Sequence, residues 1–429
     1  MFNTMLKYYS SVGLRGITLL TKFIFIVLLA RLLPSTDLGV YGLINAAVGY
    51  GIFVVGFEFY TYSTREIINS QKNRLFFILK NQALFTVISY ILCIPAFIFL
   101  LYLEILPSGS EYWFILLLFF EHLSQEINRV LITIESQSIA SFILFVRQGV
   151  WCWLAIAVML VYPNLRNITV VFIFWFGGTV SASVLGVAYI LNKKKQSDIT
   201  NWDWTWIKKG IKLSVPMLIA ALALRGFFTF DRFAVEKISG LEVLGGYTLF
   251  VSMTSAIQSF LDTILISFSF PKLALLYSGK KYIKFKSELR KFTYKLILLL
   301  SFLSICCFFT GIILVKWLDK RDYIQLFPVF ILLIAATYIY CISLIPHIAL
   351  YAMREDRYIL VSQLISFLSF LLFVFFSVYQ SDIYYLLIGM IASSVSYTTL
   401  TLPPNIEGRL LGVGGYPIKK NKKHSERQV

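Results

Sequence analysis

The sequence is poor in charged residues and in the residue types that carry catalytic and metal chemistry. Only 14% of its 429 residues are Asp, Glu, Lys or Arg, and it has three histidines and five cysteines. The histidines form no cluster and the cysteines lack metal-ligand spacing, so we expect no metal site. A glycine-rich loop of the Walker type is absent as well. These absences exclude ATP hydrolysis by this chain, and we expect no cofactor.

Acidic residues are scarcer than basic ones, with 22 Asp and Glu against 39 Lys and Arg and a net charge of +17. This charge does not indicate a nucleic-acid partner, because the basic residues gather in short segments beside long apolar runs, as the positive-inside rule expects. Hydrophobic residues make up 58% of the chain and the mean hydropathy is +0.76. Soluble domains do not reach such values. Because continuous apolar runs cross a bilayer as helices, we expect an all-α polytopic membrane protein.

We expect about twelve membrane-spanning helices, since each long apolar run supplies the ~20 residues that cross a bilayer. Their expected ranges are 10–33, 40–61, 81–103, 112–134, 141–163, 168–191, 213–236, 243–270, 293–315, 323–350, 358–379 and 383–402. An even number places both termini on one side. The loops of that side hold most of the Lys and Arg residues, so both termini are expected to be cytoplasmic.

The longest interior loop divides the expected spans into two halves. We expect an N-terminal six-helix bundle (1–191), a cytoplasmic or interfacial linker (192–212), a C-terminal six-helix bundle (213–402) and a basic cytoplasmic tail (403–429). The segment Leu38–Leu43 (LGVYGL) opens the second span and Leu244–Leu249 (LGGYTL) opens the eighth. These equivalent places indicate an internal duplication. In transporters built from repeats, the substrate site lies at the repeat interface near the bilayer midplane.

The first apolar helix, roughly residues 9–33, contains cations that a membrane span normally avoids, namely Arg15, Lys22 and Arg31. Each cation near the bilayer centre costs on the order of 2.5–3.5 kcal/mol on insertion scales. An apolar residue returns only ~0.3–0.6 kcal/mol. Arg15 and Lys22 lie about two helical turns apart and therefore on one face. We interpret this stripe as the first wall of a cationic cavity inside the membrane.

Further charges fall within later spans. Arg225 and Arg232 repeat the pattern in span 213–236, and the repeat alignment places Arg225 near the equivalent of Lys22. The candidate cations of the cavity are Arg15, Lys22, Arg31, Arg129, Arg147, Arg225 and Arg232. The candidates for ion coupling or charge pairing are Glu58, Glu121, Glu126, Asp231 and Asp262. Lys and Arg both bind phosphate, Arg through its planar fork.

An architectural role for these charges stays open. Glu126 and Arg129 can pair at i,i+3 on one helix, and the other acids can neutralise neighbouring cations. Alternatively, an acid such as Glu121 can exchange a proton when its partner leaves.

Several short motifs resemble those of the Wzx-type polysaccharide flippases, a family of the multidrug/oligosaccharidyl-lipid/polysaccharide (MOP) exporter superfamily. Near the start of the chain they are ARLLPSTDLGVYGL (30–43) and GFEFYTYSTREI (56–67), with Arg65-Glu66 the most characteristic. Around the start of the second half they are SVPMLIAAL (214–222), the Asp231-Arg232 pair and LGGYTL. The likeness covers the whole chain in length, span count and division into halves.

The resemblance implies two six-helix bundles in a V, with alternating access, in the bacterial cytoplasmic (inner) membrane. It implies translocation of undecaprenyl-diphosphate-linked oligosaccharide repeat units to the periplasmic leaflet, for O-antigen, capsule or other surface polysaccharide. Members of the family that this chain resembles usually couple transport to an ion gradient. The resemblance therefore implies a proton or a sodium ion as the counter-ion. Membrane lipid, a polysaccharide polymerase and a chain-length protein are the other implied partners.

Two other functions compete with polysaccharide translocation. A multidrug exporter of the same superfamily would carry amphipathic cations, for which an acidic cavity is expected; Lys22 and Arg225 count against it. A membrane polysaccharide polymerase or ligase would carry catalytic groups on a substantial outer loop. Every expected outer loop here is short, so we do not expect an enzyme.

Overall fold

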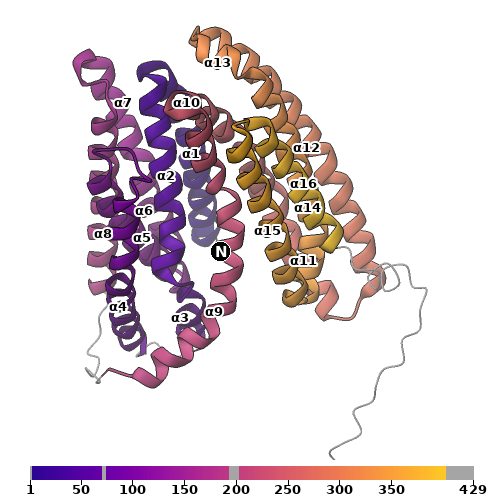
Figure 1. The fold of residues 1–429 in the computed structure, drawn as a ribbon. Coiled ribbons are helices and arrows are strands. Elements are labelled where there is room, and N and C mark those ends of the chain that lie inside the picture. The colour runs from indigo at the N-terminus through magenta and orange to yellow at the C-terminus, as the bar shows by residue number, and fades with distance from the viewer. Residues whose placement is uncertain (1, 70–73, 193–201, 402–429) are drawn as a thin grey trace, which may run out of the picture.

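The computed structural model describes residues 2–69, 74–192 and 202–401, which fold into helices joined by short turns, with no strand in these ranges (Figure 1). The expected basic tail (403–429) and residues 193–201 of the expected linker lie outside the described residues. Long apolar helices follow from the sequence because lipid offers no hydrogen bonds to the backbone, so each span must satisfy its own amide groups. The expected all-α membrane fold is confirmed.

The first half contains eight α-helices among the described residues, and their bounds follow the apolar runs closely. They are α1 (Phe2–Leu32), α2 (Ser35–Gly56), α3 (Tyr60–Asn69), α4 (Leu75–Tyr102), α5 (Glu111–Thr133), α6 (Gln137–Phe145), α7 (Trp151–Val161) and α8 (Ile168–Asn192). A π-helical turn, Val146–Val150, joins α6 to α7 and carries Arg147. Such π turns often occur at functional sites, because they turn a side chain out of the regular helical register.

The second half has a similar succession of long helices. They are α9 (Trp204–Phe227), α10 (Phe230–Leu261), α11 (Ser267–Ser278), α12 (Tyr282–Leu318), α13 (Arg321–Gln325), α14 (Phe327–Met353), α15 (Asp356–Gln380) and α16 (Ile383–Thr401). A second π-helical turn, Asp262–Ile266, joins α10 to α11. Helix α10 is interrupted at Gly240, whose φ of 78° and ψ of 177° suit glycine and not an L side chain.

Ten segments of the described chain are long and apolar enough to cross a membrane. One of them, 204–278, contains α9, α10 and α11 and is broken at Gly240. Helix α5 has 23 residues, enough to cross a bilayer, but is not among the ten, since it carries Glu111, Glu121, Glu126 and Arg129. A multi-pass membrane protein is thus confirmed, and the total of about twelve spans stays a prediction.

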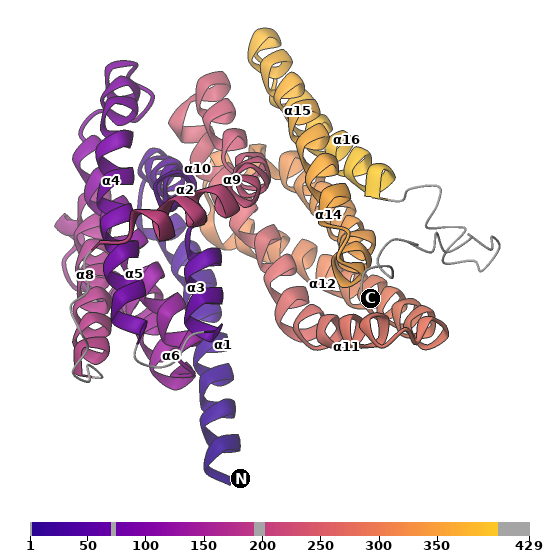
Figure 2. The same ribbon diagram turned by 90° about the horizontal axis from the view of Figure 1, so that it is seen from below.

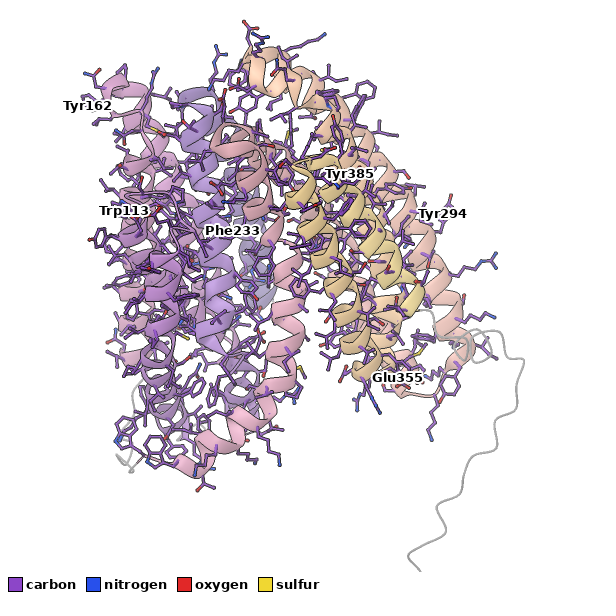
Figure 3. All side chains as sticks on the ribbon, viewed as in Figure 1. Trp113, Tyr162, Phe233, Tyr294, Glu355 and Tyr385 are labelled. Atoms are coloured by element: carbon purple, nitrogen blue, oxygen red, sulfur yellow. The ribbon has the colours of Figure 1, made fainter. Side chains whose placement is uncertain are left out.

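Large apolar side chains cover the outside of the helices as well as the interior. Tyr294 on α12 is 70% exposed and Tyr162 at the end of α7 is 59% exposed (Figure 3). Many Leu, Ile and Phe side chains along the same helices are similarly exposed. An apolar outer surface of this extent fits lipid rather than water as the surrounding medium.

The helices form two groups, one built from α1–α8 and the other from α11, α12 and α14–α16, with α9 and α10 between them (Figure 1). The groups meet at the end of the molecule where α13 lies and are further apart at the opposite end. Figure 2, a view from below, shows the two groups separately.

The two repeated segments found in the sequence pack directly against each other, α2 on α10. A Cβ added at Gly39 would lie 2.1 Å from the carbonyl oxygen of Leu241, and one at Gly245 would lie 2.0 Å from that of Ser35. In the repeat alignment Gly39 is equivalent to Gly245, and Ser35 to Leu241. The contact is therefore reciprocal, as a two-fold arrangement of two similar halves requires. Glycine at both positions permits the close backbone approach.

Candidate functional site

A cavity of about 430 Å³ lies between the two halves, and we call it the central cavity. Its walls come from α1, α2, the start of α7 and α10. Two charged side chains line it, Lys22 from α1 and Arg232 from α10, and both are cationic. The uncharged polar groups around them are Tyr41, Asn45, Thr248, Ser252, Ser255 and Ser259. The cavity thus combines positive charge with many hydrogen-bonding groups, as an anionic, hydroxylated ligand requires.

Lys22 is exposed to this cavity rather than sealed in the helix packing. Within the described part of the chain no carboxylate lies within ion-pair distance of its Nζ. Glu121 is the acid with the largest electrostatic effect on Lys22, but it is already engaged. Its Oε2 lies 3.1 Å from Nε of Arg147, and its Oε1 accepts a hydrogen bond of 2.6 Å from Trp175 Nε1. The ammonium of Lys22 therefore remains available to an anionic ligand.

Arg232 is held at a break between α9 and α10. The chain leaves the helical path at Phe228 and Thr229, and the guanidinium of Arg232 donates to the freed carbonyl oxygen of Phe228. Its Nη1 also lies 3.4 Å from Oδ1 of Asp231, whose Oδ2 accepts a 2.8 Å hydrogen bond from the Tyr247 hydroxyl. Broken helices in transporters commonly mark the substrate site, since unpaired backbone is tolerated only where it faces a cavity.

Arg15 and Arg225 do not line the central cavity. The Nε of Arg15 donates to Oγ of Ser141 on α6 at 3.3 Å. The guanidinium of Arg225 lies over the ring of Phe53 on α2, 4.8 Å from its centroid, which is a cation–π contact between the halves. Both side chains are exposed. The structure thus brings Lys22 and Arg232 to one cavity and places Arg15 and Arg225 elsewhere.

Arg129 and Arg147 are paired with acids inside the first half. Arg129 donates to Glu126, which also accepts a 2.7 Å hydrogen bond from Gln82. The guanidinium of Arg129 lies over the ring of Tyr60. Arg147 pairs with Glu121 as described above. Both arrangements match the architectural alternative that the sequence left open. Removing one partner of such a buried pair leaves an uncompensated charge, whereas the intact pair is stable.

The remaining candidate acids, Glu58 and Asp262, form no ion pair in the described ranges. Glu58 is buried between α2 and α3, where its φ of 53° marks the break between these helices. Asp262 is exposed and opens the π-helical turn after α10. An unpaired carboxylate in a membrane protein is a candidate for binding a proton or a cation.

Arg31 lies at the end of the molecule where the halves meet, in what we call the closing contact. Its Nη1 donates to the carbonyl oxygens of Trp317 and Leu318, at 2.7 and 3.0 Å. In the opposite direction, Nζ of Lys320 in the second half donates to the carbonyl oxygens of Ala30 and Leu33 in the first half, at 2.8 and 2.6 Å. Each cation thus caps the C-terminal end of a helix of the other half, α12 and α1 respectively.

Two further features complete the closing contact. Oγ of Ser35 donates to Oδ2 of Asp322 at 2.7 Å, again between the halves. Burial lowers the pKa of Lys320 from its ordinary value, while nearby Asp322 raises it. The sequence indicated a cation at position 31 but not this partner set, because nothing in the chain marks Lys320 as a residue that reaches α1.

Sequence reasoning also missed the neutral partners of the buried charges, Trp175, Gln82 and Tyr247. Tryptophan, glutamine and tyrosine occur in many membrane helices, so their type alone did not distinguish them. The hydroxyls of the central cavity, in contrast, follow a regular spacing in the sequence. Thr248, Ser252, Ser255 and Ser259 recur at intervals of three and four residues, which places them on one face of α10.

Solved structures with the same fold are transporters. One described as the inward-facing conformation of a multidrug resistance MATE family transporter of the MOP superfamily matches with a TM-score of 0.68 and 12% identity, over 92% of this chain and 96% of that chain. An outward-facing conformation of a transporter with the same description gives a TM-score of 0.55 and 10% identity, over 95% and 94%. A MATE structure in the straight conformation gives 0.55 and 11%, over 95% of each chain.

Among proteins with curated descriptions, none matches the sequence significantly. A family described as "Polysaccharide biosynthesis protein" matches residues 8–276, which include the Leu38–Leu43 and Leu244–Leu249 repeats and both cations of the central cavity. The resemblance drawn from the sequence motifs is thereby confirmed. The chain belongs to the polysaccharide biosynthesis protein family and has the fold of the MOP-superfamily transporters.

Proposed function

We propose that this protein is a flippase for undecaprenyl-diphosphate-linked oligosaccharide repeat units. It moves them from the cytoplasmic to the periplasmic leaflet of the bacterial inner membrane for assembly of O-antigen, capsule or another surface polysaccharide. The observation that carries this proposal is the central cavity, with Lys22 and Arg232 facing it from opposite halves. Family membership supports the link to polysaccharide, and the fold supports transport rather than catalysis.

The chemistry of the cavity fits a lipid diphosphate. A diphosphate carries several negative charges that cannot cross hydrocarbon unaided, and cations facing a low-dielectric cavity attract such an anion strongly. Lys22 acts as a point charge, whereas Arg232 offers a planar fork for two phosphate oxygens. The hydroxyls on α10 add neutral donors for oxygens that the cations do not reach.

The arrangement of the two halves supports an inward-open state. The halves meet at the closing contact, on the side that we expect to be periplasmic, and they diverge at the end where α9 begins (Figure 1). The TM-score is also higher against the inward-facing transporter than against the outward-facing one. In this state the central cavity would receive its substrate from the cytoplasmic leaflet.

The proposal is tested in cells by charge removal at the cavity. Lys22→Gln and Arg232→Gln should each abolish surface polysaccharide while the protein still inserts, because each variant loses a phosphate contact. Lys22→Gln breaks no ion pair, and in Arg232→Gln the carboxylate of Asp231 keeps its hydrogen bond from Tyr247. Lys22→Arg should retain part of the activity, since charge is kept. The measurement is surface polysaccharide normalised to membrane-inserted protein, with the exposed Lys284→Gln as the matched control. Normal export by both cavity variants would contradict the proposal.

A multidrug exporter is the alternative that the structural neighbours raise. Such a protein binds amphipathic cations and needs acidic groups in its cavity. The two charged side chains that line the central cavity are both basic, so the cavity favours the anionic substrate.

A further inference from the structure

A group of polar side chains surrounds His122 in the first half, and we call it the His122 cluster. Its members, from α3, α4, α5 and the turn between α2 and α3, are Glu58, Tyr60, Gln82, Tyr90, His122, Glu126 and Arg129. None of them lines the central cavity. His122 lies near the middle of α5 and is only 2% exposed. A titratable side chain buried inside a membrane protein is a candidate for carrying a proton, and the proposed contacts with the diphosphate do not use this one.

The ring of His122 has one nitrogen that is hydrogen-bonded and one that is not. The hydroxyl of Tyr90 donates to the carbonyl oxygen of Leu118 at 3.5 Å and lies 3.3 Å from Nδ1 of His122. Since a hydroxyl has a single hydrogen, Nδ1 is the donor in its contact with Tyr90. This assigns the hydrogen of the neutral ring to Nδ1 and leaves a free lone pair on Nε2. Nε2 is buried and has no hydrogen-bond partner among the described residues, which is uncommon for a buried polar atom.

The free nitrogen of His122 faces a carboxylate. Nε2 lies 3.9 Å from Oε1 of Glu126, which is one helical turn further along α5. This separation is too long for a hydrogen bond, as expected for two acceptors that face each other. Glu126 is held in place by Arg129, which donates to Oε1, and by Gln82, which donates to Oε2 at 2.7 Å. A proton on Nε2 would turn the two facing acceptors into an ion pair after a small approach.

The other groups around His122 do not take this role. Glu121 precedes His122 in the chain, but its carboxylate is bound by Arg147 and Trp175. Helix α2 presents Gly56, where an added Cβ would lie 3.0 Å from Nε2. Burial alone disfavours a charged imidazolium, whereas an opposite charge nearby favours it. Glu126 is therefore the group that makes proton binding at His122 possible.

The charges of the His122 cluster leave it one positive charge short. Two carboxylates, those of Glu58 and Glu126, face one guanidinium, that of Arg129. Arg225 on α9 of the second half acts on both Glu58 and Arg129 electrostatically. A proton on His122 would balance the charges within the first half and so weaken the attraction of the cluster for Arg225. Proton binding would thereby change the force between the two halves.

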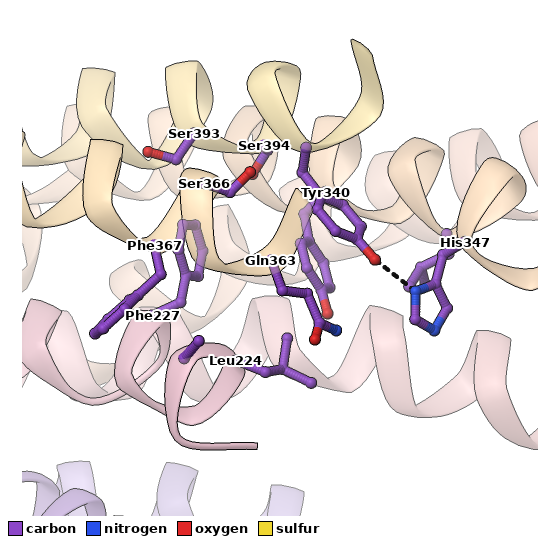
Figure 4. Close-up of a pocket in the computed structure, with 12 residues that line it drawn as sticks. Leu224, Phe227, Tyr340, His347, Gln363, Ser366, Phe367, Ser393 and Ser394 are labelled. Atoms are coloured by element: carbon purple, nitrogen blue, oxygen red, sulfur yellow. Dashed lines mark hydrogen bonds between the residues drawn. The ribbon is translucent and has the colours of Figure 1, made fainter. Parts of the chain in front are cut away.

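A second histidine within the helices lacks this arrangement and provides a comparison in the same chain. Nδ1 of His347 on α14 lies 2.5 Å from the hydroxyl of Tyr397 (Figure 4). The pocket that His347 lines, between α9, α14, α15 and α16, has no Asp, Glu, Lys or Arg in its lining. Both histidines thus have a tyrosine partner. No carboxylate of the described residues lies within ion-pair distance of His347, whereas Glu126 lies at that distance from His122.

We propose that His122 and Glu126 form a proton-binding site in the first half. Nε2 of His122 takes up a proton from water, forming an N–H bond, and Oε1 of Glu126 stabilises the resulting imidazolium. Loss of the same proton restores the neutral ring. The ligand is a proton and not a sodium ion, since hard cations bind sets of oxygen ligands and not an imidazole nitrogen. The inference rests on the proposed function in one respect, namely that the gradient of this proton drives translocation.

Proton binding is tested by a nitrogen-15 NMR titration of the purified, histidine-labelled protein in lipid nanodiscs. The chain has three histidines, and replacing each with Gln assigns its signals. We expect Nε2 of His122 to change from a bare to a protonated nitrogen between about pH 8 and about pH 5. His347 should stay neutral over the same range, because no acid stands beside it. A His122 ring that stays neutral down to about pH 5 would overturn the proposal.

Removal of the carboxylate tests the part played by Glu126. Glu126→Gln should move the midpoint of the His122 titration at least about one pH unit lower, because the imidazolium loses its opposite charge. This variant leaves Arg129 without an acid, so the double variant Glu126→Gln with Arg129→Gln, which leaves neither charge behind, is titrated alongside and should shift in the same direction. An unchanged midpoint in both variants would contradict a shared site.

Transport in proteoliposomes connects the site with the proposed function. His122→Gln should lose the stimulation of translocation by a proton gradient, whereas His347→Gln, the matched control, should keep it. Stimulation of His122→Gln at the wild-type level would overturn the coupling role. Lys22→Gln should still show the His122 titration, even where it abolishes translocation. A failure of the proton site and a failure of the diphosphate proposal therefore give different results.

Discussion

At the scale of single residues, the intramembrane cations differ in what holds them. Arg147 and Arg129 are paired with Glu121 and Glu126 within the first half. Lys22 faces a cavity and has no acid within ion-pair distance among the described side chains. The paired cations belong to the architecture of the half, because their charge is already neutralised. Of the two cations of the central cavity, Lys22 is the one with which no described acid pairs, whereas Arg232 faces the cavity and also lies 3.4 Å from Asp231.

This difference predicts that breaking an ion pair lowers stability, whereas removing the charge of Lys22 does not. Glu121→Gln should destabilise the protein by about 3–5 kcal/mol, because it leaves Arg147 as a buried charge without a partner. The double variant Glu121→Gln with Arg147→Met should recover much of that loss. The measurement is thermal unfolding of the purified protein in detergent. Glu288→Gln is the control, since its pairs with Lys272 and Lys291 lie on the surface, where ion pairs contribute little to stability.

Lys22→Gln should leave the unfolding temperature nearly unchanged in the same experiment. A large loss of stability on Lys22→Gln, or none on Glu121→Gln, would show that the assignment of structural and cavity cations is reversed.

At the scale of helices, the halves are joined by two kinds of contact. Helices α2 and α10 pack closely through Gly39 and Gly245, which is a backbone contact with little freedom to separate. The closing contact is different, because it consists of side-chain hydrogen bonds to helix ends from Arg31 and Lys320. If access alternates, these hydrogen bonds must break while the glycine contact acts as the pivot.

A reversible cross-link tests this role. Ser35→Cys with Asp322→Cys should form a disulfide, since the two side chains meet at 2.7 Å in the closed end. Oxidation should stop translocation and reductant should restore it, because the closed end can then open again. Each single cysteine variant serves as the control and should transport under both conditions. Full transport by the oxidised double variant would show that this end does not open.

The sequence predicted those features that depend on composition or on local pattern. Apolar runs predicted the helices, and the Leu-Gly-x-Tyr segments predicted a duplication whose repeats now prove to pack together at Gly39 and Gly245. Lys22 and Arg232 were expected in the cavity and line it. Long-range contacts could not be predicted, because they depend on how each helix is rotated about its axis. The Trp175–Glu121 hydrogen bond and the closing contact, which joins the two halves, belong to this group.

At the scale of the whole molecule, the structure combines a closed end with a cationic cavity between the halves. A two-fold arrangement of similar halves suits alternating access, since the substrate site lies at their interface and either end can close over it. Glu58 and Asp262, which form no ion pair with the described residues, are candidates to couple this movement to a proton or sodium gradient.

The central claim is that Lys22 and Arg232 carry a lipid diphosphate across the membrane. The most direct measurement is translocation of mass-tagged, undecaprenyl-diphosphate-linked oligosaccharide in reconstituted liposomes, under a proton or a sodium gradient in turn. We expect gradient-driven translocation by the wild type and by Lys284→Gln, and loss of translocation in the Lys22→Gln, Arg232→Gln double variant. Translocation by that double variant at the wild-type rate would contradict the proposed function.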